Sequence, residues 1–337
     1  MTGCGVLTFT DRGIYCPAGD FYIDPWRPVP RALITHAHSD HARWGHGRYL
    51  ATPRSLAVMR HRLGDICAQA TDYGQVLRIG DAEVSFHPAG HVPGSAQIRV
   101  CVAGQVWVAS GDYKTENDGL SEPFAPLPCH SFITESTFGL PVFRWQPQPQ
   151  ITEQILRWWQ GNRAAGKTSV LGAYALGKAQ RLLHMLADGP GPILCHAAVE
   201  NTNASLRATG VALPQTDVLT PECSAKTHPG ALIIAPPGAI EASWTRRFGP
   251  TEVALASGWM GLRGIRRRRA MATGFVISDH ADWPGLLQAT KETGAENIYV
   301  THGYTDIFTR YLNENGHRAQ VVPTEFGTDD DDSAGPA

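Results

Sequence analysis

Short apolar runs typical of β-strands recur along this chain, and several of them end close to a histidine or a carboxylate. The runs 33–34, 106–109, 132–134, 275–278 and 298–301 lead into His36, Asp112, Glu135, His280 and His302. Functional groups gathered at strand ends are typical of a rigid sheet whose loops carry a site. The pattern therefore predicts a sheet-based fold with its chemistry on the loops.

Helical patterns separate the apolar runs, so strands and helices alternate along the chain. They span 55–63, 152–165, 176–187 and 284–293. With 337 residues, of which 42% are hydrophobic and 18% charged, the chain can bury a substantial core and form two domains. The predicted fold class is α/β.

The region 146–272 has a helix and strand alternation of its own and carries none of the candidate metal ligands. We therefore expect an α/β domain inserted into a discontinuous first domain, which comprises 1–145 and 273–328. The acidic run that opens 329–337 predicts a disordered, solvated tail.

Composition places the chain in the cytoplasm. No run of eighteen apolar residues occurs, and the N-terminus lacks the charged-then-apolar order of a secretory signal, so no membrane association is expected. The seven cysteines are scattered singly, which is typical of reduced thiols.

The net charge of −2 does not by itself indicate an anionic partner, but the basic residues are clustered. The cluster comprises Arg263, Arg266, Arg267, Arg268 and Arg269. Such a cluster can lie along a polyanion. Taken alone, however, it is more typical of an exposed helical face.

Four residues of metal-ligand type, His36, His38, Asp40 and His41, lie within six positions. Imidazole nitrogen and carboxylate oxygen suit Zn²⁺, Mn²⁺ and Fe²⁺. In an extended or looping segment, positions 36 and 38 point the same way while 40 and 41 diverge, so one stretch can serve two ions. Burying these groups directly after a strand without a metal would be costly.

Two metal ions need further ligands from elsewhere in the chain. His91, Asp112 and His302 are such candidates, and a carboxylate at position 112 can bridge two ions about 3.5 to 4 Å apart. The other histidines, His46 among them, are expected to be surface or hydrogen-bonded core residues.

Segment 36–41 meets in full the His-x-His-x-Asp-His signature of the metallo-β-lactamase fold, which the chain therefore resembles. Glu135 in Thr-Glu-Ser-Thr-Phe-Gly, His280 in Ser-Asp-His-Ala-Asp and His302 in Thr-His-Gly resemble the three later motifs of the β-CASP nucleases. Residues 175–180 are similar to the Gly-Arg-Ala-Gln segment that opens a helix in their inserted domain.

The resemblance implies an αββα metallo-β-lactamase sandwich with an inserted β-CASP-like domain. Through 257–260 and 278–283 the chain looks most like the bacterial ligase-associated DNA exonucleases, also described as manganese-dependent DNA endonucleases. This closer resemblance implies cleavage of single-stranded DNA and a role in DNA repair. It also implies a DNA ligase and a helicase as partners in the pathway. Tyr304 stands where RNA-processing relatives often have Glu, which favours DNA.

The resemblance also implies a ligand set for two divalent ions. One ion is assigned to His36, His38, His91 and Asp112, and the other to Asp40, His41, Asp112 and His302. Asp40, besides being a ligand, belongs to the implied catalytic residues with Asp24, Glu135 and His280.

Two of these residues have roles outside the metal ligands. Asp24 is expected to orient a ligand histidine, although an Asp before Pro25 is also typical of a turn. His280 is expected to serve the leaving oxygen, as a proton donor or a phosphate contact, with Glu135 holding it in the charged form.

Nucleic-acid contacts are expected from basic and aromatic residues of the insert. They are Lys178, Trp259, Arg263, Arg266, Arg267, Arg268 and Arg269, which would contact phosphates and stack on bases.

Several alternatives stay open at this point. RNA is a possible substrate, and the metal, the choice between exonuclease and endonuclease action, the polarity and the oligomeric state are not fixed by these residues. A hydrolase of small thioesters or lactams is disfavoured by the large insert, because a small substrate needs only a pocket of about 300 to 1,000 Å³. A non-enzymatic nucleic-acid-binding subunit is disfavoured by the intact ligand set.

Overall fold

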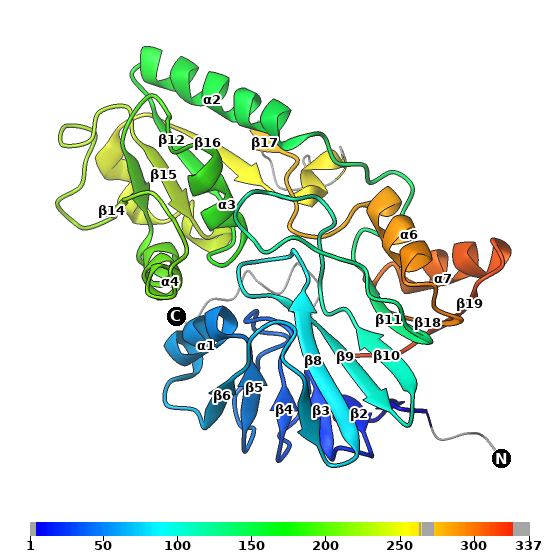
Figure 1. The fold of residues 1–337 in the computed structure, drawn as a ribbon. Coiled ribbons are helices and arrows are strands. Elements are labelled where there is room, and N and C mark those ends of the chain that lie inside the picture. The colour runs from blue at the N-terminus through cyan, green and yellow to red at the C-terminus, as the bar shows by residue number, and fades with distance from the viewer. Residues whose placement is uncertain (1–4, 263, 265–272, 326–337) are drawn as a thin grey trace. The chain divides into compact units, whose positions relative to one another are not determined.

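The computed structural model describes residues 5–262, 264 and 273–325 (Figure 1). These residues form two compact units, which are described separately below. Unit 1 comprises the described residues up to 144 and from 279 onward, and unit 2 comprises those from 145 to 278. The five arginines of the basic cluster and the acidic tail lie outside the described residues.

Unit 1 contains two sheets. The first is formed by β1 (Thr8–Phe9), β2 (Ile14–Cys16), β3 (Phe21–Ile23), β4 (Ala32–Leu33), β5 (Tyr49–Ala51) and β6 (Ala68–Ala70), in that order. β1, β2 and β3 pair antiparallel, whereas β3 to β6 pair parallel.

The second sheet carries most of the strands that end in functional residues. In chain order its strands are β7 (Leu77–Ile79), β8 (Ala82–Pro88), β9 (Ala96–Val102), β10 (Gln105–Ala109), β11 (Ser131–Ser136), β18 (Asn297–Gly303) and β19 (Arg318–Val321). They lie in the order β19-β18-β11-β10-β9-β8-β7. β10, β11, β18 and β19 run parallel, so the carboxyl ends of these strands meet at one edge.

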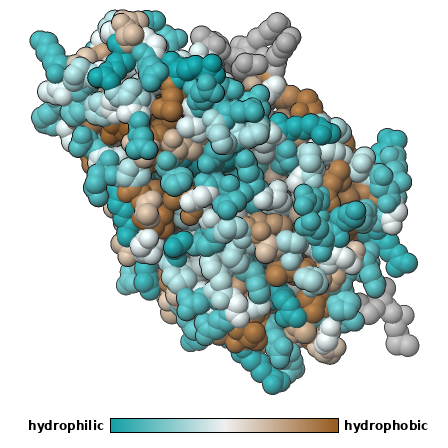
Figure 2. Space-filling model, turned by 45° about the horizontal axis from the view of Figure 1, so that its top comes forward, coloured by the Kyte–Doolittle hydropathy of each residue, from teal (hydrophilic) through white to brown (hydrophobic). Residues whose placement is uncertain are grey.

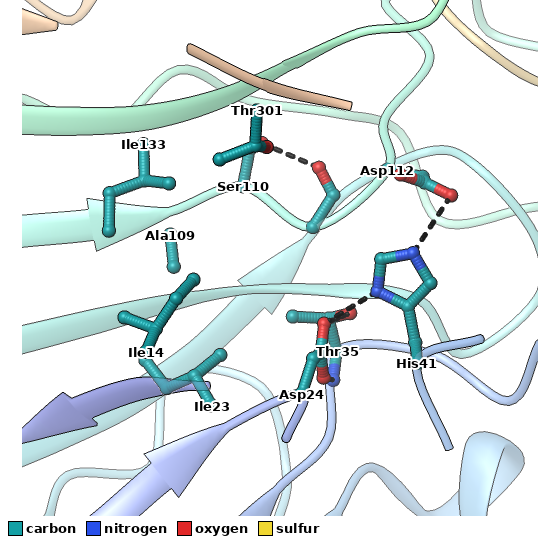
Figure 3. A pocket seen from close by; sticks show the side chains of 11 residues that line it. Ile14, Ile23, Asp24, Thr35, His41, Ala109, Ser110, Asp112, Ile133 and Thr301 are labelled. Atoms are coloured by element: carbon teal, nitrogen blue, oxygen red, sulfur yellow. Dashed lines mark hydrogen bonds and ion pairs between the residues drawn. The ribbon is translucent and has the colours of Figure 1, made fainter. Parts of the chain in front are cut away.

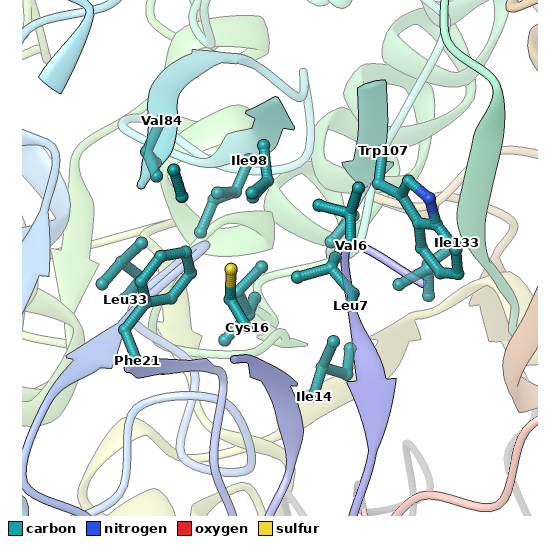
Figure 4. Close-up of a cluster of buried hydrophobic side chains, with 14 of the residues drawn as sticks. Val6, Leu7, Ile14, Cys16, Phe21, Leu33, Val84, Ile98, Trp107 and Ile133 are labelled. Carbon is teal, nitrogen blue, oxygen red and sulfur yellow. The ribbon is translucent and has the colours of Figure 1, made fainter. Parts of the chain in front are cut away.

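The two sheets of unit 1 pack face to face. Phe21 and Leu33 of the first sheet and Ile98 and Ile133 of the second share one buried hydrophobic cluster (Figure 4). Successive strand residues face opposite sides, so Phe132, next to Ile133, belongs to a different cluster on the outer face of the second sheet.

Helices cover the outer faces of the two sheets. α6 (Trp283–Glu292) and α7 (Thr305–Glu314) bury Leu286 and Phe308 against the outer face of the second sheet. α1 (Pro53–Leu63) lies beside β5 and β6 of the first sheet (Figure 1). This layering confirms the predicted α/β class and the αββα arrangement.

Unit 2 is built on one parallel sheet with the order β14-β13-β15-β12-β16-β17. Its strands are β12 (Thr168–Gly172), β13 (Ile193–Cys195), β14 (Asp217–Val218), β15 (Leu232–Ala235), β16 (Thr251–Ala256) and β17 (Thr273–Phe275). The helices are α2 (Gln148–Ala164), α3 (Lys178–Met185) and α4 (Ala197–Arg207), with the short 3₁₀ turns η1 (Pro237–Ala239), η2 (Ser243–Phe248) and η3 (Gly258–Gly261).

Both faces of the unit 2 sheet are covered. Leu171 and Ile234 belong to one buried cluster, and their neighbours Val170 and Ile233 belong to another. This explains the continuous apolar runs of its strands. β17 pairs with β16 and so places 273–275 in this sheet, beyond the expected limit at residue 272.

The face shown in Figure 2 is mostly hydrophilic, with hydrophobic side chains scattered over it. Within the described ranges, every helix is too short or too polar to cross a membrane.

Trp159 provides a test of the packing in unit 2. Its ring on α2 is fully buried, and its Nε1 donates a hydrogen bond of 2.9 Å to the carbonyl of Gly230. Trp159→Ala is expected to lower the free energy of unfolding by about 3 to 5 kcal/mol, because it removes this bond and leaves a cavity. Urea unfolding followed by circular dichroism measures the change. Trp159→Phe keeps an aromatic ring in place and should lower the free energy of unfolding clearly less than Trp159→Ala does. Equal stability of Trp159→Ala and the wild type would contradict this packing.

Candidate metal centre

The histidine-rich segment is held between the two sheets of unit 1. Directly after β4, the amide of Ile34 donates to Leu50 of the first sheet, and the carbonyl of Thr35 accepts from Ala96 at the start of β9. The backbone is therefore fixed on both sides of Thr35, and the following residue, His36, projects from a fully buried position.

His36, His38, His91 and Asp112 bring one ligand atom each to a common point. Nδ1 of His38 lies 3.1 Å from Nε2 of His36 and 3.1 Å from Nε2 of His91. Oδ2 of Asp112 lies 3.4 Å from Nε2 of His36 and 3.7 Å from Nε2 of His91.

The spacing of these four atoms can be compared with that around a metal ion. Nitrogen and oxygen ligands at about 2.0 to 2.2 Å from a tetrahedral ion lie about 3.3 to 3.6 Å from one another. The observed separations of 3.1 to 3.7 Å are close to this range. The first ligand group therefore fits a divalent metal ion.

Asp40, His41 and His302 form a second group of ligand atoms. Nε2 of His41 lies 3.5 Å from Oδ2 of Asp40 and 3.4 Å from Oδ2 of Asp112. The same oxygen of Asp112 thus faces ligands of both groups, which is the arrangement of a bridging carboxylate.

Burial and charge set the protonation of these groups in the absence of a metal. Burial, which disfavours a charged ring, holds the pKa values of His36 and His91 well below the usual range. Burial acts the same way on His41, but the carboxylates of Asp40 and Asp112 outweigh it and raise the pKa of His41 well above the usual range. Neutral His36 and His91 offer the lone pairs that a metal requires.

Asp112 is ionised at the centre of this cluster. Burial alone would raise its pKa, but the surrounding histidines, His41 foremost, hold the pKa well below the usual range. A buried anion among imidazoles is a suitable ligand for a cation.

Asp24 lies behind His41, on the side away from Asp112 (Figure 3). Its Oδ2 is 2.8 Å from Nδ1 of His41, and its Oδ1 accepts a hydrogen bond of 2.8 Å from the amide of Thr35. A carboxylate at Nδ1 directs the other ring nitrogen, Nε2, toward the ligand group. These are the contacts needed to orient a ligand histidine.

His280 and Glu135 form a buried pair at the same site. Nδ1 of His280 lies 2.9 and 3.0 Å from the two carboxylate oxygens of Glu135, which also accepts from the amide of Tyr113 at 2.8 Å. Both residues lie within reach of Asp112, so they also form a group of metal-ligand type. The rings of His280 and His91 are 4.6 Å apart.

Two positioning groups were not predicted from the sequence. The hydroxyl of Thr35 donates to Oδ2 of Asp24 and lies 3.1 Å from Nδ1 of His36. The backbone carbonyl of Asp279 lies 2.8 Å from Nδ1 of His91 and so directs Nε2 of His91 to the site. Thr35 directly precedes the motif and was a recognisable candidate, whereas a carbonyl group has no sequence signal.

The predicted nucleic-acid contacts lie in unit 2 or outside the described residues. Lys178 is only 4% exposed, and its ammonium lies 4.4 Å from the ring centre of Tyr174. Trp259 is half-buried in η3.

The chain is similar in sequence to several known proteins. None of the protein-family models matches the chain. The chain is 30% identical over 318 residues to a probable DNA ligase of Opitutus terrae, covering 92% of this chain and 30% of that protein. It is 28% identical over 194 residues to a ribonuclease of Thermus thermophilus, covering 49% of this chain and 44% of the ribonuclease. The chain thus spans less than half the length of either relative.

Among solved structures, a protein of unknown function from Enterococcus faecalis V583 has the same fold, with a TM-score of 0.57 and 10% identity over 88% of this chain and 80% of that one. With the two ligand groups, the matches show that the chain is a relative of the nucleases of the metallo-β-lactamase and β-CASP class.

Asp24→Asn tests the orientation of His41. An amide of the same size offers one acceptor oxygen in place of two, so it cannot accept from both the backbone amide of Thr35, now at Oδ1, and Nδ1 of His41, now at Oδ2. We expect the metal affinity to fall by about 10- to 100-fold. Calorimetric titration of the metal-free protein with Mn²⁺ measures this, with the exposed carboxylate variant Asp11→Asn as the control. An unchanged affinity in Asp24→Asn would contradict the role.

Proposed function

We propose that this protein is a metal-dependent phosphodiesterase that cleaves single-stranded DNA. The observation that carries the proposal is the position of Asp112, whose one oxygen faces both ligand groups beside the His280–Glu135 pair. Two bound cations, Mn²⁺, Zn²⁺ or Fe²⁺, would supply positive charge for a phosphate and lower the pKa of a water molecule.

The residues of the proposed site are either metal ligands or groups that handle protons. The first ion would be held by His36, His38 and His91, and the second by Asp40, His41 and His302. Asp112 would be a ligand of both ions. Asp24 keeps His41 in the required orientation through Nδ1.

His280 is the proposed proton donor or phosphate contact at the leaving oxygen. Glu135 engages Nδ1 of His280, so we assign this role to its Nε2. Glu135 is in turn fixed by the amide of Tyr113, so the pair is held in place before a substrate arrives.

The choice of DNA rests on two observations. The first relative named above is a probable DNA ligase, which fits a role in DNA repair beside a ligase and a helicase. By the family resemblance, Tyr304 stands where RNA-processing relatives often have Glu, which favours DNA. An RNA-processing nuclease is the second candidate, because the other relative is a ribonuclease.

A cleavage assay on labelled single strands tests the proposal. Linear and circular strands, each as DNA and as RNA, are incubated with Mn²⁺ or Zn²⁺. We expect cleavage of DNA that stops on chelation and is absent in His38→Ala, which lacks a ligand of the first ion. Cleavage of RNA alone would select the second candidate. Full activity of His38→Ala would contradict the metal mechanism itself.

His280→Ala separates proton handling from metal binding. We expect turnover to fall by about 10²- to 10⁴-fold, because the proton donor is lost, while both metal ions are retained. Elemental analysis of the purified protein gives the metal content, and His61→Ala, an exposed histidine of α1, serves as the control. A variant that loses metal would show that His280 is a ligand instead.

A further inference from the structure

The carboxyl end of β18, which carries the ligand His302, departs from a regular strand. Ile298 and Val300 belong to the buried cluster on the outer face of the second sheet. Thr301 faces the other way and lines a cavity with residues of both sheets (Figure 3). Because successive strand residues face opposite sides, His302 would turn to the outer face if the strand continued regularly. It would then face the helix layer and not the ligands that follow β4.

A β-bulge at His302 breaks this alternation. Along β11, Glu135 is paired with Thr301 of β18. The next residue, Ser136, is paired with Gly303, so His302 is an extra residue of β18. Its φ is +54°, in the left-handed region that residues other than glycine seldom adopt. Bulges next to active sites re-aim a side chain, and the ligand atom of His302 lies within 4.8 Å of the other two of the second group.

Ser136, the last residue of β11, contacts the backbone on both sides of this bulge. It is fully buried. Its hydroxyl donates to the carbonyl of His302 at 2.6 Å, and the carbonyl of Thr301 lies 3.3 Å from the same hydroxyl. Its own carbonyl accepts from the amide of Tyr304 at 2.9 Å. The peptide groups before and after His302 are thus tied to one residue.

The hydroxyl of Ser136 holds a backbone conformation that costs free energy. A residue other than glycine stays in the left-handed region only when its surroundings hold it there. A buried serine hydroxyl needs an acceptor in any fold, but here the acceptor is the carbonyl of the ligand residue itself. Without this bond the backbone at His302 can relax toward a regular strand, which turns the imidazole away from the second ligand group.

We propose that Ser136 is a positioning residue for the second metal ion. Through the carbonyl of His302 it holds the bulge that directs this imidazole to Asp40 and His41. The first ligand group is oriented by other contacts, such as the carbonyl of Asp279 at Nδ1 of His91. The effect of Ser136 is therefore specific to the second ion. This inference rests on the two-ion centre of the proposed function and adds a residue to it.

Titration with Mn²⁺ alone tests the role of the hydroxyl. The metal-free full-length protein is titrated by calorimetry, and we expect two binding events in the wild type. Ser136→Ala should keep the affinity of the first event and lose about 10- to 100-fold in the second, because a group that orients a ligand is removed. At a Mn²⁺ concentration that fills both sites of the wild type, electron paramagnetic resonance should show a coupled Mn²⁺ pair in the wild type and mainly single ions in Ser136→Ala.

Three further variants separate positioning from other effects. Ser131→Ala removes another buried hydroxyl, at the start of the same strand, and should leave both affinities unchanged. His302→Ala removes the ligand itself and sets the lower limit for the second affinity. Gly303→Ala places a side chain against the backbone of Ser136 and Thr137, so it should displace the bulge and weaken the second event although the hydroxyl remains. Urea unfolding of the metal-free variants shows whether each is folded.

The outcomes distinguish this inference from the proposed function. Two ions bound by Ser136→Ala with wild-type affinities and a coupled signal would overturn the positioning role and leave the proposed function intact. An equal loss of both ions in Ser136→Ala would also overturn it, because the effect would not be specific to the second ion. A wild type that binds one ion would instead overturn the two-ion centre, and the positioning role with it.

Discussion

The candidate site depends on one buried carboxylate. Asp112 follows β10 and lies between His36, His41 and His91, with a single oxygen 3.4 to 3.7 Å from a nitrogen of each. An anion in such a position requires positive charge, and the surrounding histidines supply it only by taking up protons. Divalent ions held by these ligands would supply that charge and let the histidines stay neutral.

The sandwich brings these groups together by placing strand ends from both sheets at one edge. Two glycines permit the close approach of the loops. A side chain at Gly111, which has a φ of +56°, would meet Thr35, and one at Gly303, with a φ of +85°, would lie 2.4 Å from the carbonyl of Ser136. Gly303 directly follows His302, so the path of the backbone after this ligand depends on a residue without a side chain.

Much of this arrangement could be predicted because the signals are local. The motif at 36–41 and the carboxylates or histidines after strands are visible in the sequence, and the expected helices form as α1, α2, α3 and α6. The position of the Lys178 ammonium beside the ring of Tyr174, four residues earlier, was not predicted.

Other contacts depend on where distant segments meet. The carbonyl of Asp279 is placed against His91 only by the tertiary fold, and Arg43 ties the histidine-bearing turn to Glu325 from the far end of the chain. The choice between DNA and RNA could not be predicted for the same reason. It depends on contacts with the sugar and the base of the substrate, which the spacing of residues in the sequence does not reveal.

The most direct test of the account is the position of the metal ions themselves. Anomalous diffraction from crystals of the protein loaded with Mn²⁺ locates each ion without reference to activity. We expect two peaks about 3.5 to 4 Å apart with the carboxylate of Asp112 between them. A single peak, or two peaks that do not share Asp112, would contradict the shared-carboxylate centre on which the proposed chemistry depends.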